Sequence, residues 1–206
     1  MRLGIFGGSF DPVHYGHLLL AETCREQAEL DEVWFVPNSL SPFKQEHPPA
    51  PARQRLEMLQ LAIGGHANFR VSTIEVDRGG VSYTVDTVAE IAQQHPEAEL
   101  FFLLGGDSLA DLAKWREPQR ICELALPLVV QRHGSPEPRY EMLAPLLTPE
   151  RLEAVRSMTV VMPIIELSST DLRQRAAAGK SLRFRTPRAV EKYIETQRLY
   201  RHQSQE

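Results

Sequence analysis

Two histidines stand three residues apart in a glycine-rich turn near the start of the chain. The turn runs from Gly7 to His17, with the sequence GGSFDPVHYGH, and follows a short apolar segment over residues 2–6. We expect His14 and His17 to share one face of a helix start, beside free backbone N–H groups. Imidazoles there can donate hydrogen bonds to phosphate oxygens and stabilise the charge of a phosphoryl transition state. The pattern therefore predicts phosphate chemistry.

Other interpretations of the same turn are weaker. A His-x-x-His pair is also half of a metal site, but no third histidine, cysteine or carboxylate has convincing ligand spacing. A single histidine in this place would more often be a structural hydrogen-bonding residue. The turn is not GxGxxG, so it does not indicate a hydride-transfer dinucleotide fold.

A second candidate phosphate element lies far along the chain, in the segment LSSTDLR over residues 167–173. Serine and threonine at a helix start cap free N–H groups, and the helix dipole there favours an anion. Arg173 follows Thr170 by three residues, so its planar guanidinium can lean over the same turn. Taken alone, the segment favours a plain helix cap with a solvated arginine over a phosphate site.

Three further segments could hold a second, flat substrate. The helix start at Tyr83 and Thr84 can bind a carboxylate, and Asp107, after Gly105, can accept hydrogen bonds from ribose hydroxyls. Trp115 can stack on a heterocycle. Locally, an N-cap role for Asp107 and core packing for Trp115 are as well supported as these functions.

The elements that must position these residues alternate between strand and helix. Apolar runs predict strands at 2–6, 32–36, 69–76, 99–104, 127–131 and 159–162. Helices are expected at 17–30, 53–63, 84–94, 107–115, 119–124 and 168–178, with two short ones between 139 and 155. Thr186 is expected to cap a last helix, with Pro187 as its first residue, to about residue 197.

This order predicts an α/β fold of Rossmann-like, doubly wound type, with a mainly parallel sheet and helices on both faces. We expect one domain over residues 1–206, with the helical part from about 168 packed on it. The sequence does not decide the oligomeric state, and a homo-oligomer is one option.

Composition excludes several classes of function. The 206 residues are 42% hydrophobic and 24% charged, and the formal charge of −4 does not favour nucleic acid. We expect no signal peptide and no membrane helix. Two cysteines without CxxC spacing indicate a cytoplasmic protein with free thiols, and a single disulfide is the less favoured alternative.

The turn over residues 7–17 resembles the signature of the nucleotidyltransferase superfamily, and most of all that of bacterial nicotinate-nucleotide adenylyltransferases. The segment at 167–173 is similar to that family's Ile-Ser-Ser-Thr-x-x-Arg element, with Leu167 in place of isoleucine. The resemblance implies that His17, His14 and Arg173 are catalytic. It further implies that ATP contacts Gly7, Gly8, Ser9, Phe10, His14, His17, Gly105, Asp107, Ser168, Thr170 and Arg173.

The same resemblance implies a binding site for a pyridine mononucleotide. Thr84 and its neighbours would meet the nicotinate carboxylate, and Trp115 would stack on the ring. Lys44 matches a family lysine near the phosphates, although the family more often has Pro-Pro-His-Lys where this chain has Ser41-Pro42-Phe43-Lys44. The implied mononucleotide contacts are Asn38, Lys44, Tyr83, Thr84, Trp115 and Arg132.

The function implied is transfer of the adenylyl group of ATP to nicotinate mononucleotide, with Mg²⁺ held through the substrate phosphates and no protein metal site. Three alternatives stay open on sequence. They are a sister transferase for phosphopantetheine or a cytidylyl acceptor, an aminoacyl-tRNA-synthetase-like enzyme, and a non-catalytic nucleotide sensor. The second is disfavoured, because we find no Lys-Met-Ser-Lys-Ser-like loop, tRNA-binding domain or basic surface in this sequence.

Overall fold

The structure is a computed structural model that describes residues 1–40, 50–134 and 136–201, apart from the side chains of Asp107 and Ala110. Six parallel strands form one sheet in the order β3-β2-β1-β4-β5-β6. The strands are β1 (Arg2–Gly8), β2 (Glu32–Pro37), β3 (Phe69–Val71), β4 (Glu99–Gly105), β5 (Leu126–Arg132) and β6 (Val160–Met162). The predicted parallel α/β sheet is confirmed.

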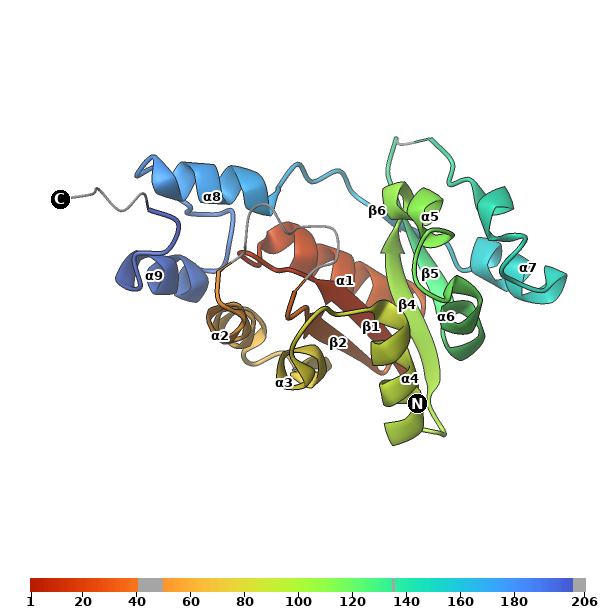
Figure 1. Cartoon of the computed structure of the whole chain (residues 1–206). Coiled ribbons are helices and arrows are strands. Elements are labelled where there is room, and N and C mark those ends of the chain that lie inside the picture. Colours follow the sequence, from red (N-terminus) through yellow and green to blue (C-terminus); the bar gives the residue numbers. More distant parts are fainter. Residues whose placement is uncertain (41–49, 135, 202–206) are drawn as a thin grey trace.

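Helices cover both faces of this sheet (Figure 1). One group, α2, α8 and α9, lies at one end of the molecule, and α5, α6 and α7 lie at the other. The helices are α1 (Tyr15–Gln27), α2 (Ala52–Ile63), α3 (Ile74–Arg78), α4 (Thr84–Gln94), α5 (Gly106–Leu112), α6 (Pro118–Leu124), η1 (Tyr140–Leu143), α7 (Pro149–Ser157), α8 (Ser169–Ala177) and α9 (Arg188–Thr196).

Alternation of side chains along the strands builds two separate hydrophobic layers. In β4, Phe101 and Leu103 join a cluster with α1, α2, α8 and α9. Their neighbours Phe102 and Leu104 face the other way, into a cluster with α4, α5, α6 and α7. A strand that is apolar on both faces is therefore explained by helices on both sides, which confirms the doubly wound arrangement.

The direction of winding reverses between β1 and β4. From β1 the chain continues to β2 and β3 on one side, whereas β4, β5 and β6 follow on the other. In open α/β sheets, ligands bind outside the carboxyl ends of the strands at such a switch point. The turn after β1, which carries the two histidines, and the glycines at the end of β4 therefore flank the expected crevice.

Two expectations about local structure were wrong. Residues 69–76 are not one extended segment, because β3 ends at Val71 and α3 begins at Ile74. The bend turns Glu75 inward, where its carboxylate accepts a hydrogen bond from Thr87 Oγ1 at 2.7 Å. Thr186 does not cap the last helix, since its hydroxyl donates to the Val13 carbonyl at 2.8 Å and Pro187 takes the cap position.

Within the described part of the chain, no helix has the length and hydropathy that a bilayer crossing requires.

Candidate active site

The two histidines stack face to face at the start of α1. His14 is the N-cap residue and His17 is the third helical residue, and their ring centroids lie 3.7 Å apart with planes inclined by 22°. Phe10 packs against the second of these rings, because it is 1% exposed and meets the His17 ring edge-on at 5.1 Å. The expectation that the two imidazoles share one face is confirmed, with α1 beginning two residues earlier than the sequence indicated.

Hydrogen bonding defines the tautomer of His17. Its Nδ1 accepts the backbone N–H of His14 at 3.3 Å. Neutral His17 must therefore carry its proton on Nε2, which leaves that atom as a hydrogen-bond donor.

His14 is a neutral group in this site. It is 5% exposed, and its buried Nδ1 has no hydrogen-bond partner among the described residues. Burial lowers the pKa of His14 from 6.5 to about 4, more than its backbone hydrogen bond raises it. An uncharged imidazole here avoids repulsion from the positive end of the helix dipole.

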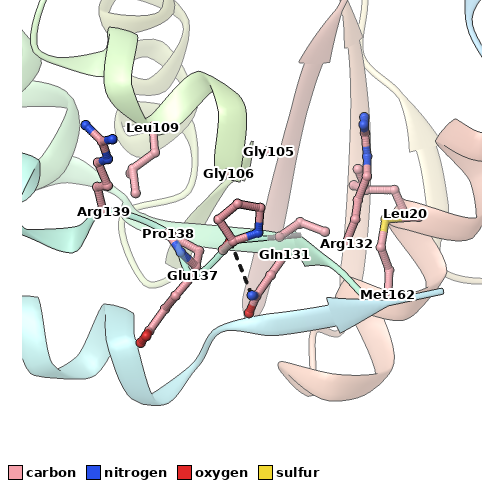
Figure 2. Close-up of a pocket in the computed structure, with 12 residues that line it drawn as sticks. Leu20, Gly105, Gly106, Leu109, Gln131, Arg132, Glu137, Pro138, Arg139 and Met162 are labelled. Carbon is pink, nitrogen blue, oxygen red and sulfur yellow. Dashed lines mark hydrogen bonds between the residues drawn. The ribbon is translucent and has the colours of Figure 1, made fainter. Parts of the chain in front are cut away.

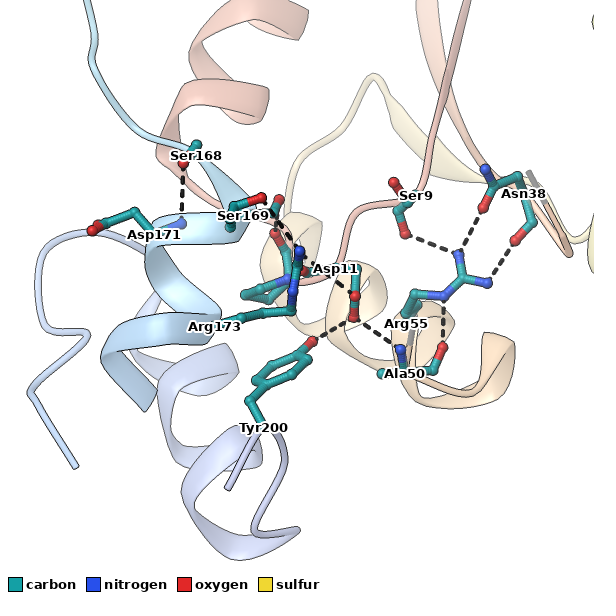
Figure 3. Close-up of polar contacts among 12 residues, drawn as sticks. Ser9, Asp11, Asn38, Ala50, Arg55, Ser168, Ser169, Asp171, Arg173 and Tyr200 are labelled. Atoms are coloured by element: carbon teal, nitrogen blue, oxygen red, sulfur yellow. Dashed lines mark hydrogen bonds and ion pairs between the residues drawn. The ribbon is translucent and has the colours of Figure 1, made fainter. Parts of the chain in front are cut away.

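The start of α8 packs against the turn after β1. Arg173 Nη1 donates to the Asp11 carbonyl at 2.7 Å and lies 3.7 Å from the Asp11 carboxylate, and Ser169 Oγ donates to the Pro12 carbonyl at 2.9 Å (Figure 3). Ser168 caps α8 by accepting the Asp171 N–H at 3.1 Å. The structure thus brings together the two candidate phosphate elements, which are about 160 residues apart in sequence.

The remaining polar groups of this helix start face outward. Thr170 Oγ1 accepts a hydrogen bond from Arg173 Nη2 at 3.3 Å. Both Ser168 and Thr170 are exposed, and the Arg173 side chain keeps 36% of its surface accessible. A ligand at the turn after β1 can therefore reach the hydroxyls and the guanidinium without displacing core side chains.

A buried arginine that the sequence analysis missed organises the same turn. Arg55, on α2, is 1% exposed. Its guanidinium donates to the carbonyls of Ser9 (2.9 Å), Ala50 (2.9 Å), Asn38 (2.7 Å) and Ser39 (3.2 Å), and to Asn38 Oδ1 at 3.2 Å (Figure 3). Asn38 lies where it was expected, at the end of β2, and its amide oxygen faces Arg55.

The segments expected to bind the second substrate also meet. The guanidinium carbon of Arg116 lies 4.8 Å from the Tyr83 ring centroid, which joins the turn after α5 to the start of α4. The neighbouring Trp115 is partly buried, with its ring edge-on to Phe102 at 5.6 Å. Tyr83 precedes α4 and Thr84 begins it, so the free N–H groups of this helix point toward the same region.

This acceptor region is tied to the end of β2. Ser39 N donates to Ser82 Oγ at 3.0 Å, and Ser82 N donates to the Leu40 carbonyl at 2.9 Å. Behind them Glu75 is buried, and burial raises the pKa of its carboxyl above the ordinary value. The residues that precede Tyr83 are therefore held by a continuous set of hydrogen bonds.

A pocket of about 350 Å³ opens at the carboxyl ends of β4 and β5 (Figure 2). Gly105 and Gly106 line it together with Arg132, which is exposed at the end of β5. Among the described residues, its lining does not include Tyr83, Thr84 or Trp115. Arg132 therefore lies with the glycines expected to meet ATP and not with the acceptor segments.

Of the other expected residues, Gly7 and Gly8 end β1 and Phe10 lies in the turn after it. Gly7 is exposed, and a Cβ atom on Gly8 would lie 3.0 Å from the Phe10 ring, a tight contact that disfavours a side chain there. Phe10 does not present its side chain to a ligand, because the ring is packed in the core. Lys44 and the side chain of Asp107 lie outside the described residues.

Sequence signals existed for some of the missed residues. Arg55 stands four positions before Leu59 and eight before Ile63, which places it on the buried stripe of α2. Asp11 belongs to the turn itself, and its carboxylate accepts hydrogen bonds from Ala50 N at 3.2 Å and Tyr200 Oη at 2.7 Å. Nothing in the sequence indicates that Tyr200, near the chain end, reaches this turn.

Other chemistries find little support in the described residues. No group of three or more His, Cys, Asp or Glu side chains in this part of the chain could hold a metal ion. The cysteines are free and buried, and burial raises the pKa of Cys24 to about 12 and that of Cys122 to about 11. These thiols are therefore protonated and unreactive near neutral pH.

A glycine-rich turn and a facing helix start at the switch point of a parallel sheet define a nucleotide-binding α/β protein. Comparison with known proteins agrees. The Cytidylyltransferase-like family matches residues 5–175. A protein of Thermomicrobium roseum named "Probable nicotinate-nucleotide adenylyltransferase" is 42% identical over 97% of this chain and 92% of its own length.

A Thermus thermophilus protein of the same name is 43% identical, over 98% of this chain and 100% of its own length. Among solved structures, the Plasmodium falciparum nicotinic acid mononucleotide adenylyltransferase complexed with NaAD superposes with a TM-score of 0.72. It covers 97% of each chain at 17% identity, which supports the fold alone. The chain belongs to the cytidylyltransferase-like family and, within it, to the nicotinate-nucleotide adenylyltransferases.

The Arg55 hydrogen bonds predict a large effect of Arg55→Lys on stability. Lysine cannot reproduce the planar five-donor fork, so buried carbonyls lose their partners and the free energy of unfolding should fall by about 3 kcal/mol. Chemical denaturation measures this. The control is Arg53→Lys on the same helix, where the side chain is 91% exposed and the change should stay within about 0.5 kcal/mol. Equal effects of the two substitutions would contradict the role of Arg55.

The lowered pKa of His14 predicts a pH-dependent stability. An unfolded histidine takes up a proton near pH 6.5 and folded His14 only near pH 4, so its contribution is complete above 6.5 and is lost as the pH falls through that window. The loss should reach about 3 kcal/mol below pH 4. Between pH 7 and pH 4, the difference between the unfolding free energies of wild type and His14→Asn should change by this amount, because only wild type loses stability through this group. Parallel curves would refute the assignment.

Proposed function

We propose that this chain transfers the adenylyl group of ATP to nicotinate mononucleotide, giving nicotinate adenine dinucleotide and pyrophosphate, as a step of NAD biosynthesis. The observation that carries the proposal is the hydrogen bond from Arg173 to the Asp11 carbonyl, which joins two distant phosphate elements at the sheet's switch point. The names of the relatives support the same reaction.

The triphosphate of ATP lies, in this proposal, between the start of α1 and the start of α8. His17 donates from Nε2 to an α-phosphate oxygen, where negative charge grows during the reaction. Neutral His14 lies beside it, and Ser168, Thr170 and Arg173 bind the β- and γ-phosphates. Gly7, Gly8 and the backbone of Ser9 and Phe10 allow close approach, and Gly105 and Asp107 meet the nucleoside.

The mononucleotide lies on the acceptor side. The N–H groups at Tyr83 and Thr84 donate hydrogen bonds to the nicotinate carboxylate, because a helix N-terminus favours an anion. Trp115 stacks on the pyridine ring. Asn38, Lys44 and Arg132 are proposed as further contacts, with Arg132 the least supported because it lines the pocket beside Gly105.

The reaction needs little covalent help from the protein. The mononucleotide phosphate attacks the α-phosphorus of ATP in line, a phosphorus–oxygen bond forms, and the bond to the leaving pyrophosphate breaks. The nucleophile is already an anion at neutral pH, so a general base is not required. Positioning and charge stabilisation supply the acceleration. ATP is proposed to enter as its Mg²⁺ complex, with the ion held by phosphates and water.

We propose that residues 1–206 act as one domain, since side chains of α8 and α9 share a hydrophobic cluster with the strands. A cytoplasmic location is also proposed, supported by two buried cysteines that form no disulfide.

The decisive experiment measures pyrophosphate release from ATP with nicotinate and nicotinamide mononucleotide side by side. We expect release with the nicotinate compound to be the faster.

His17→Ala should lower kcat by about 100-fold or more, because it removes transition-state stabilisation. His66→Ala, on the turn after α2, is the control and should leave turnover unchanged. Wild-type turnover in His17→Ala would exclude the role given to His17.

Stacking on Trp115 predicts a selective loss of acceptor binding. Trp115→Ala should raise KM for nicotinate mononucleotide by about tenfold, because base–aromatic stacking is worth about 1–3 kcal/mol. KM for ATP should change little. Trp34→Ala, a partly buried tryptophan of β2, controls for loss of packing. An effect confined to KM for ATP would show that the ring does not stack on the pyridine.

A further inference from the structure

Asp11 is a buried carboxylate inside a loop proposed to bind anions. Its side chain is 5% exposed, and Oδ1 accepts hydrogen bonds from Tyr200 Oη at 2.7 Å and from Ala50 N at 3.2 Å. The other oxygen, Oδ2, lies 3.7 Å from Arg173 Nη1 (Figure 3). Two neutral donors therefore satisfy one carboxylate oxygen, while the cation lies beyond hydrogen-bond range of the carboxylate and forms only an ion pair with it.

The position of Arg173 depends on how fully other donors satisfy the Asp11 carboxylate. Nη1 of Arg173 is directed to the Asp11 carbonyl at 2.7 Å, and Nη2 is directed to Thr170 Oγ1 at 3.3 Å. A buried carboxylate that loses a donor attracts the nearest cation more strongly, since unpaired buried charge is costly. If the Tyr200 hydroxyl were missing, Arg173 would move onto the carboxylate and fewer of its N–H groups would face a ligand.

Tyr200 is well placed to be this donor. Its backbone follows a turn after α9, where Leu199 N donates to the Ile194 carbonyl at 3.0 Å. The side chains of Leu199 and Tyr200 pack against the same hydrophobic cluster as β1 and β2. Burial, and then the Asp11 charge, raise the pKa of Tyr200, so the hydroxyl stays protonated over the working range.

We propose that Tyr200 is a positioning residue, which holds the Asp11 carboxylate with a neutral hydrogen bond and thereby keeps the Arg173 guanidinium free to bind the phosphates of ATP. This inference rests on the proposed function only in the role given to Arg173. It makes the last turn of the described chain part of the nucleotide site, 189 residues away from Asp11 in sequence.

Tyr200→Phe tests the proposal because it removes one oxygen atom and keeps the ring. We expect KM for ATP to rise and kcat to fall, together about tenfold in kcat/KM, since small displacements of positioning groups are costly. KM for nicotinate mononucleotide should stay unchanged. Calorimetry with ATP alone should report the same weakening, so the result does not depend on turnover.

The matched control is Tyr193→Phe. The Tyr193 hydroxyl also donates to a carboxylate, Glu57 Oε2 at 2.6 Å, but that pair joins α9 to α2 away from Arg173. This variant should keep wild-type kinetics and ATP affinity. Unchanged ATP binding in Tyr200→Phe, or equal losses in the two variants, would overturn the proposal.

Double variants separate positioning from a general loss of structure. In an Arg173→Ala background, Tyr200→Phe should have almost no further effect on ATP binding, because the group on which it acts is absent. The same should hold in an Asp11→Asn background, which serves if Arg173→Ala folds poorly. A persisting effect in these backgrounds refutes the proposal. Wild type that binds ATP normally but releases no pyrophosphate would instead refute the proposed function alone.

Discussion

The hydrogen bonds of one buried cation, the guanidinium of Arg55, hold the carboxyl edge of the sheet together. Its donors meet carbonyl oxygens after β1 and β2 and at the start of α2, so three segments share one anchor. A turn rich in glycine has few side chains to order it, and a planar five-donor group supplies that order. The turn is therefore shaped before any nucleotide binds, which is what electrostatic preorganisation requires.

The same anchor relates the two substrate regions to each other. Asn38, held by Arg55, is followed by Ser39, whose N–H donates to Ser82 just before the proposed acceptor helix. Glu75 then bonds Thr87 inside the first turns of that helix. In-line transfer needs the attacking phosphate and the α-phosphorus aligned to within a fraction of an ångström, and a hydrogen-bonded chain between their binding segments meets that need.

Sequence reasoning succeeded where a pattern is local. Strands apolar on both faces implied the doubly wound sheet, and the spacing in the turn from Gly7 to His17 implied that its two histidines share one face. It failed where a tertiary partner decides the outcome. Arg55 received no role from the sequence, because the carbonyls that satisfy it come from distant loops. Residues 74–76 were expected to continue an extended segment, yet they belong to α3, where Glu75 reaches Thr87.

The proposed phosphate site contains a carboxylate, and the chain has a net charge of −4. Groups within the site must therefore offset the repulsion of a bound anion. The turn meets that need with directed hydrogen-bond donors. His14 is kept neutral by burial, neutral His17 carries its proton on Nε2, and Asp11 is enclosed by neutral donors with Arg173 near it. The Asp11 charge is thus compensated inside the protein, and in the proposed function the triphosphate meets N–H and O–H groups. In that proposal, selectivity for phosphate follows from the directions of these donors, which the packing of α8 against the turn maintains.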